Sequence, residues 1–324
     1  MAPRGPLASS RGTFGFAFER ALIPTIATMA NPVENPTTNR RDLMTKGALL
    51  GAGAVVGSVA TATIASSAEP DRYTRGMNAL RDISGERGPQ VVASLNDIAP
   101  DLGRYIVEFA FGDIYLRSGL DAPQRQLVTV AALAAQGDTA PQLNFHIDAA
   151  LQVGVTPVEI IESLIHLVPF TGFARALNAV TVARKVFTDT GTTFTPPVQN
   201  DDSNRYDRGA RKLVEIDGQH GLDVIESLRD ISPDLGRYIV EFAFGDVYNR
   251  RWLSPQQRQL VTIGALTAFG DTAPQLRVHI GAALNVGLHR SHVIEALIHL
   301  VSYTGFPRVL NAITVARDVF AQHG

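Results

Sequence analysis

Four of the eight histidines are the side chains best suited to chemistry, because imidazole changes its charge near neutral pH. They form two pairs with a spacing of 133 residues, His146 with His279 and His166 with His299. His146 lies among apolar residues at helical spacing. It is therefore either a satisfied core residue or a proton carrier whose pKa is moved by burial. For His166 the pattern favours a structural or helix-end role.

Four arginines could hold a negatively charged substrate. They form two pairs at the same spacing, Arg125 with Arg258 and Arg175 with Arg308, and a guanidinium binds a carboxylate through two parallel hydrogen bonds. An interface salt bridge is the alternative. Among the acids, Glu108 and Asp113 are five positions apart, about 140° around an α-helix, which predicts that they do not share a face.

Other polar residues have simpler interpretations. Asp138 and Asp271 directly precede Thr-Ala-Pro and are predicted to cap helices. His289 and His292 occur only in the second half of the chain and are predicted to be surface residues. No His-Glu-x-x-His pattern or comparable ligand cluster is present in the sequence, so no metal and no cofactor are expected.

The composition excludes several classes of protein. The chain has 324 residues and no cysteine, which removes disulfides, thiolate metal sites and thiol redox chemistry. After residue 68 it holds 23 basic and 28 acidic residues, an acidic balance that argues against nucleic acid as a partner. A charged fraction of 19% is too low for a disordered protein.

The residues that could do chemistry are positioned by a duplicated module. Residues 101–113 recur unchanged as 234–246, and about two thirds of positions from 101 to 187 are identical at the 133-residue offset. The predicted organisation is a leader over 1–68, a first module over 71–190, a linker over 191–204 and a second module over 205–324. Near-identity of the modules predicts the same site in both.

Each module is predicted to be helical. Pro123 and Pro255 are expected to lie near the start of one helix, beginning at Asp121 and Ser254, since the first turn tolerates the missing N–H of proline. Pro141 and Pro274 are expected to open the next helix. Thr156-Pro-Val-Glu159 has the pattern of a capping box, and Gly154 and Gly287 are expected to end the preceding helices. With apolar spacing of 3.6 residues and no hairpin signal, the fold class is predicted to be all-α.

The leader carries an export pattern. Arg40 and Arg41 precede an uncharged stretch over 47–68 that is rich in Gly, Ala, Val, Ser and Thr and ends in small residues. A twin-arginine signal, recognised by the twin-arginine export machinery, is therefore predicted, with a periplasmic or extracellular destination. An uncleaved membrane anchor and cytoplasmic retention are the alternatives, although the composition makes a poor bilayer helix. Translation starts at Met1 or at Met29, which would give a shorter leader.

Taken together, the motifs resemble the carboxymuconolactone decarboxylase family. They lie at 124–135, 137–146 and 149–159, with closing segments Phe170-Thr-Gly-Phe and Tyr303-Thr-Gly-Phe-Pro. The resemblance covers both modules and implies two tandem helical bundles of the kind found in AhpD proteins. It also implies that His146 and His279 match the family histidine. Gln126 and Gln259 stand where decarboxylase members usually have Glu, and an amide cannot titrate.

The resemblance implies a cofactor-independent lyase that acts on a small carboxylated, lactone-type substrate. His146 and His279 would carry the proton, Arg125 and Arg258 would anchor the carboxylate, and Gln126 and Gln259 would complete the site. The cavity is expected between the helix of Arg125 and the helix of His146, closed by an adjoining module. A thiol peroxidase is excluded because the chain lacks cysteine.

Two further expectations follow from the duplication. An oligomeric binding or assembly protein that kept the fold without catalysis is the alternative function. The two modules are expected to take the places of two subunits of single-module relatives. Relatives built from six modules would then correspond to a homotrimer of this chain.

Overall fold

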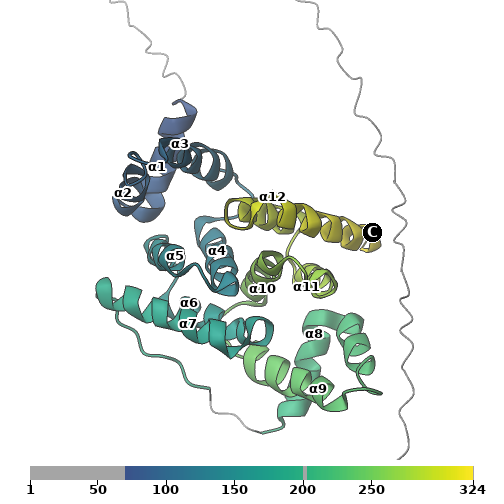
Figure 1. The fold of residues 1–324 in the computed structure, drawn as a ribbon. Helices are drawn as coiled ribbons and strands as arrows, with labels where there is room; N and C mark the ends of the chain where they lie inside the picture. Colours follow the sequence, from purple (N-terminus) through teal and green to yellow (C-terminus); the bar gives the residue numbers. More distant parts are fainter. Residues whose placement is uncertain (1–69, 200–202, 324) are drawn as a thin grey trace, which may run out of the picture. The chain divides into compact units, whose positions relative to one another are not determined.

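Helix-starting residues and apolar periodicity produce eight helical elements in the described part of the first module. The computed structural model describes residues 70–199 and 203–323, and the predicted leader over 1–68 with its export signal lies outside these residues. The first-module helices (Figure 1) are α1 (Arg72–Ser84), α2 (Arg87–Ala93), α3 (Pro100–Tyr105), the π-helix η1 (Ile106–Tyr115), α4 (Ala122–Gln136), α5 (Ala140–Gln152), α6 (Pro157–His166) and α7 (Val168–Asp189).

The second module repeats these helices in the same order. They are α8 (Arg205–Glu226), α9 (Pro233–Tyr238), the π-helix η2 (Ile239–Tyr248), α10 (Pro255–Phe269), α11 (Ala273–Asn285) and α12 (Arg290–Gln322). The last helix spans the counterparts of α6 and α7 and kinks at Gly305, where φ is +78°. The prediction of an all-α fold with two tandem modules is confirmed for the residues that the structure describes.

The predicted helix starts have a local cause in capping. Asp121 and Ser254 cap α4 and α10, and each accepts a hydrogen bond from the backbone N–H three residues on. Thr156 caps α6 through the predicted capping box with Glu159.

The capping prediction is wrong for Asp138 and Asp271. The N-cap residues of α5 and α11 are Thr139 and Thr272. Their hydroxyls donate to the carbonyls of Leu133 and Leu266, because the chain turns sharply between the two helices.

The prediction for Glu108 and Asp113 is also wrong, because the segment that holds them is a π-helix. Hydrogen bonds from residue i to i+5 stack side chains that lie five positions apart. Arg72 contacts both acids, with Nε 3.0 Å from an Asp113 oxygen and a terminal nitrogen 3.4 Å from a Glu108 oxygen. Helix α1 approaches this π-helix closely at Gly76, where a Cβ atom would lie 2.0 Å from the Val107 carbonyl oxygen.

The two modules share one hydrophobic core. Helices α4 and α10 lie side by side at its centre (Figure 1), and a Cβ atom on Gly264 would lie 2.8 Å from the Val128 carbonyl oxygen. Every residue from Arg125 to Ala135 on α4 is buried. One cluster of buried apolar residues from both modules surrounds this helix pair, and two smaller clusters lie around α1 with η1 and around α8 with η2. The duplication therefore yields one folded body.

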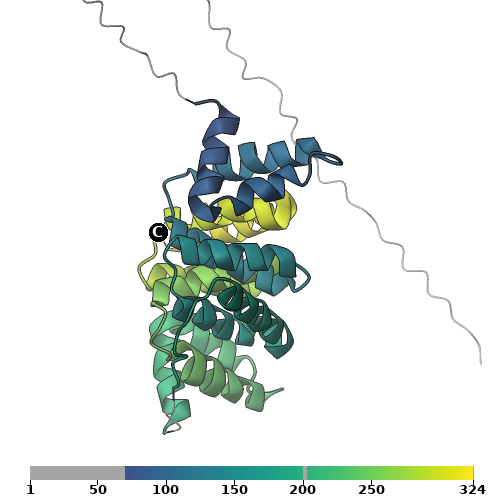
Figure 2. The same cartoon turned by 90° about the vertical axis from the view of Figure 1, so that its left-hand side faces the viewer.

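Helix α12 is long and apolar enough to cross a bilayer by length and composition, and is the single such helix within 70–199 and 203–323. It is interrupted at Gly305, and Leu297 and Leu300 lie fully buried in the shared core. A core helix of a folded protein accounts for these properties. Figure 2 shows α12, in yellow, packed beside the first-module helices.

Candidate active site

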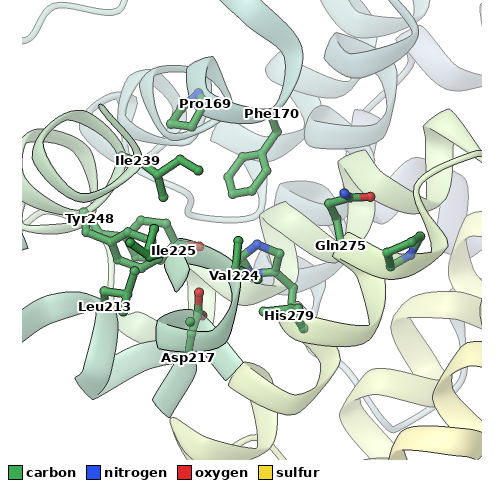
Figure 3. Close-up of a pocket in the computed structure, with 15 residues that line it drawn as sticks. Pro169, Phe170, Leu213, Asp217, Val224, Ile225, Ile239, Tyr248, Gln275 and His279 are labelled. Carbon is green, nitrogen blue, oxygen red and sulfur yellow. The ribbon is translucent and has the colours of Figure 1, made fainter. Parts of the chain in front are cut away.

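A cavity of about 340 Å³ lies beside His279 of the second module. It is lined mainly by apolar side chains of α8, η2 and α11, and the first module contributes Pro169 and Phe170 (Figure 3). Its titratable lining residues are Asp217, Tyr248 and His279. An apolar cavity of this size with a few polar groups is typical of a small-molecule site. We call it the second-module cavity.

His279 is held in place by Gln259. The His279 side chain is buried, and its Nδ1 atom lies 3.1 Å from Gln259 Oε1. The amide nitrogen of Gln259 donates to the Tyr248 hydroxyl at 3.5 Å. In this arrangement Nδ1 carries the proton and Nε2 keeps its lone pair. Burial lowers the pKa of His279 to about 4, so the ring is neutral at pH 7.

The first module builds a related but longer chain of hydrogen bonds. His146 Nδ1 lies 3.0 Å from Gln126 Oε1, and the Gln126 amide donates to the Tyr115 hydroxyl at 3.2 Å. Tyr115 is in turn hydrogen bonded at 2.8 Å to Tyr303 of the second module. Burial, and then the positive charge of Arg87, lower the pKa of His146 to about 3.

The two modules therefore share the His–Gln–Tyr arrangement, so the prediction of the same site is correct for these three residues and wrong for two of the residues around them. Phe170 occupies in the second-module cavity the position that Tyr303 occupies beside His146, so the hydroxyl at the end of the hydrogen-bond chain is missing there. A second difference lies on the first helix of each module, where Ser84 corresponds to Asp217.

Arg258 is not among the lining residues of the cavity. One terminal nitrogen donates to His166 Nδ1 at 3.1 Å and the other to the Arg250 carbonyl. Burial lowers the pKa of Arg258 to about 10, which leaves it charged at pH 7. Arg125 has the same arrangement with His299 and the Arg117 carbonyl. Anchoring of a substrate carboxylate by these arginines stays a prediction, and it would require them to exchange these partners.

His166 and His299 join the modules, in line with the structural role favoured for His166. His166 Nε2 donates to the Thr262 hydroxyl at 2.9 Å, since Arg258 already donates to the other ring nitrogen. His299 makes the reciprocal contact with Thr129 at 2.7 Å. Burial, followed by the facing arginine, lowers the pKa of both rings well below the ordinary range.

An ion pair reinforces each of these junctions. Glu162 is buried, and its carboxylate accepts two hydrogen bonds from Arg250, at 2.7 and 2.6 Å. Arg117 and Glu295 form the equivalent pair. Because each central helix is held by residues of the other module, neither site is complete within one module.

The position of the cavity was predicted in part. The adjoining module does close it, through Pro169 and Phe170, but α10 with Arg258 and Gln259 contributes no lining residue. The cavity lies between α11 and the pair α8 and η2. Sequence reasoning missed Asp217 and Tyr248, although the replacement of Ser84 by an acid at the repeat offset was a usable signal for the first of them.

The remaining candidate residues lie away from the cavity. His289 caps α12 and is exposed, with its backbone N–H donating to His292 Nδ1 at 3.0 Å. Within 70–199 and 203–323 there is no group of three or more His, Asp or Glu side chains placed to hold a metal ion.

The described residues form an all-α, two-module protein with a buried neutral histidine beside a mainly apolar cavity. The sequence model of the carboxymuconolactone decarboxylase family matches residues 100–185 and again residues 233–318, more than half of the chain. The chain therefore belongs to the carboxymuconolactone decarboxylase family.

Its relatives include named decarboxylases. It is 34% identical over 124 residues to 4-carboxymuconolactone decarboxylase of Acinetobacter baylyi, covering 38% of this chain and 92% of that protein. It is 33% identical over 84 residues to nitrosuccinic acid decarboxylase of Metarhizium robertsii, covering 26% of this chain and 58% of that protein. A solved structure of a candidate gamma-carboxymuconolactone decarboxylase subunit from Burkholderia xenovorans shares 26% identity with a TM-score of 0.49, covering 79% of this chain and 99% of that one.

Proposed function

We propose that this protein is a carboxy-lyase that removes CO2 from a small carboxylated, lactone-type substrate without a cofactor. Family membership supports the reaction class. The observation that carries the proposal is the second-module cavity, where a neutral imidazole faces mainly apolar walls. His279 is the proposed proton carrier there, and His146 is its counterpart in the first module.

The chemistry requires little beyond a shaped, apolar site. The bond to the carboxylate breaks, CO2 leaves, and the electron pair passes into the conjugated carbonyl of the lactone. The resulting carbanion then takes a proton at carbon, a step suited to a positioned histidine. Apolar lining favours the reaction because the charge of a carboxylate is localised, whereas the charge of the intermediate is spread over several atoms.

A single-turnover assay tests this proposal. Purified protein, treated with a chelator and supplied with no cofactor, is mixed with a panel of lactone acids while CO2 release is followed. Turnover above a heat-inactivated control supports the lyase. Tight binding of the same acids without CO2 release would instead support the alternative, an oligomeric binding protein that kept the fold.

We also propose that three chains assemble into a homotrimer. Both modules expose the same large apolar side chains, as expected for a surface that is covered in an assembly. These repeated residues are Ile98 and Ile231, Leu102 and Leu235, Tyr105 and Tyr238, Phe173 and Phe306, and Leu177 and Leu310.

Light scattering should give a mass about three times that of one chain. Replacing Leu177 and Leu310 together by Glu should lower this mass, because a buried charge opposes assembly. Val198, an exposed residue without a counterpart at the repeat offset, provides the control when replaced by Glu. A stable monomer of the unaltered protein at micromolar concentration would exclude the trimer.

Export through the twin-arginine machinery is proposed from the leader sequence. Replacing Arg40 and Arg41 by Lys should trap the precursor in the cytoplasm, whereas Lys46→Arg, which keeps the charge, should be exported normally. Cell fractionation with immunoblotting measures both outcomes. Export of the double-lysine variant at the normal rate would rule out this signal.

A further inference from the structure

We propose that Asp217 stores the proton that His279 delivers to carbon, so that the second-module cavity holds an acid which the first module lacks. This inference rests on the proposed decarboxylation. The carboxyl group of Asp217 is buried, and the proposed decarboxylation as described above assigns no role to it.

The position of Asp217 is unusual for an acid. Its side chain is only 6% exposed, yet it lines the cavity, and its Oδ1 atom has no hydrogen-bond partner among the described residues. Figure 3 shows Asp217 of α8 and His279 of α11 reaching toward the same space, which Phe170 borders. A buried, unpartnered carboxylate is costly, and a carboxylic acid in the same place is not.

The surroundings of Asp217 keep it protonated near neutral pH. Burial raises its pKa to about 7. The titratable groups that line the cavity with it are Tyr248 from η2 and His279 from α11, while α7 contributes only Pro169 and Phe170. Burial, followed by the charge of Asp217, raises the pKa of Tyr248, which therefore stays neutral. No cation lines the cavity to stabilise an Asp217 carboxylate.

His279 needs such a proton source. With a pKa of about 4, the ring holds no extra proton at pH 7, whereas decarboxylation of a carboxylate consumes one proton for each product formed. Asp217 gives its proton to the lone pair of His279 Nε2. His279 passes this proton to the carbon from which electrons were released to the carbonyl. The Asp217 carboxylate regains a proton from solvent after the product leaves.

The first module provides an internal comparison. Ser84, the counterpart of Asp217, donates its hydroxyl to the Leu80 carbonyl at 2.6 Å and has no acidic proton to offer. The second-module site therefore has an acid at this position, in Asp217, and the first-module site has none.

The decisive experiment is the pH profile of kcat for the wild type and for the variants Asp217→Asn and Asp217→Ser. The second variant introduces the residue that the first module has at this position, Ser84. Wild-type kcat should be level below about pH 7 and fall above it. Both variants should lose roughly 10²–10³-fold in kcat at pH 7 with a smaller change in KM. Their kcat should rise about tenfold for each pH unit of acidification between pH 8 and 6, because His279 must then take its proton from solvent. Asp217→Glu should restore part of the level region.

Asp223→Asn, on the exposed side of the same helix, is the matched control and should leave the profile unchanged. Variants at Asp217 that keep the wild-type kcat and pH profile would overturn the proposal while leaving the lyase itself intact.

If no lactone acid is turned over, infrared spectroscopy tests proton storage by Asp217 separately from the proposed lyase activity. The wild type minus Asp217→Asn difference spectrum should contain a protonated carboxyl band that disappears with a midpoint near pH 7. This band supports proton storage independently of activity. Its absence at pH 6 would overturn the proposal, whatever the assay shows.

Discussion

Replacing His279 by glutamine should lower the rate of CO2 release from a lactone acid by about 10²–10⁴-fold, the usual contribution of a positioned acid–base group. Glutamine can still hydrogen bond to Gln259, so the packing of the cavity wall should survive, but it cannot carry a proton. The measurement is single-turnover CO2 release at pH 7, with far-ultraviolet circular dichroism to verify the fold.

His146→Gln is the matched variant. His146 has the same burial, the same amide partner and the same place in the repeat, but Ser84 replaces the acid. We therefore expect His146→Gln to cost far less activity than His279→Gln. If each variant instead kept about half of the wild-type rate, the two sites would be equivalent and the assignment of catalysis to the second module would be wrong.

The fold was predictable because its signals are local or repeated. Asp121, Ser254 and Thr156 start helices by capping backbone N–H groups within three residues, so a short sequence window contains the whole interaction. The 133-residue repeat then extends each assignment to the second module. Buried His146 and His279 were predictable for a similar reason, since apolar neighbours at helical spacing indicate an inward-facing residue.

The composition of the site was less predictable because it depends on contacts between distant segments. The π-helices, which place Tyr115 and Tyr248 beside the central helices, resemble ordinary helices in sequence. Asp217 belongs to a polar stretch of α8 that gives little sign of burial, and its environment is created by η2, α11 and the first module. One partner of Arg258, His166, comes from the other module, and the sequence gives no sign of this contact.

The second large effect expected is a steep loss of stability between pH 6.5 and pH 5. His146, His166, His279 and His299 are all buried, and burial lowers the pKa of each below its ordinary value of 6.5. Because these pKa values are lowered in the folded protein, the unfolded chain binds more protons at these four positions in this pH range than the folded chain does. Stability therefore falls as the pH falls through 6.5.

Asp217 acts in the opposite direction. Its pKa of about 7 lies above the ordinary value of 3.8, so between these values the folded state holds a proton that the unfolded state lacks. This adds stability as the pH falls through 7 and offsets one of the four histidines. The four histidines outnumber this one carboxyl group, so the net effect of acidification between pH 6 and 5 is a loss of stability.

Urea unfolding followed at pH 7.5, 6.5 and 5.5 measures this dependence. The free energy of unfolding should be nearly constant between the first two values and clearly lower at the third. Asp217→Asn removes the offset, so its stability should fall more steeply with acidification than that of the wild type, whereas the exposed His289→Asn should change little. Equal stability of the wild type at pH 7.5 and 5.5 would mean that the four histidines can become protonated within the folded protein, and a neutral His279 at the cavity would then be incorrect.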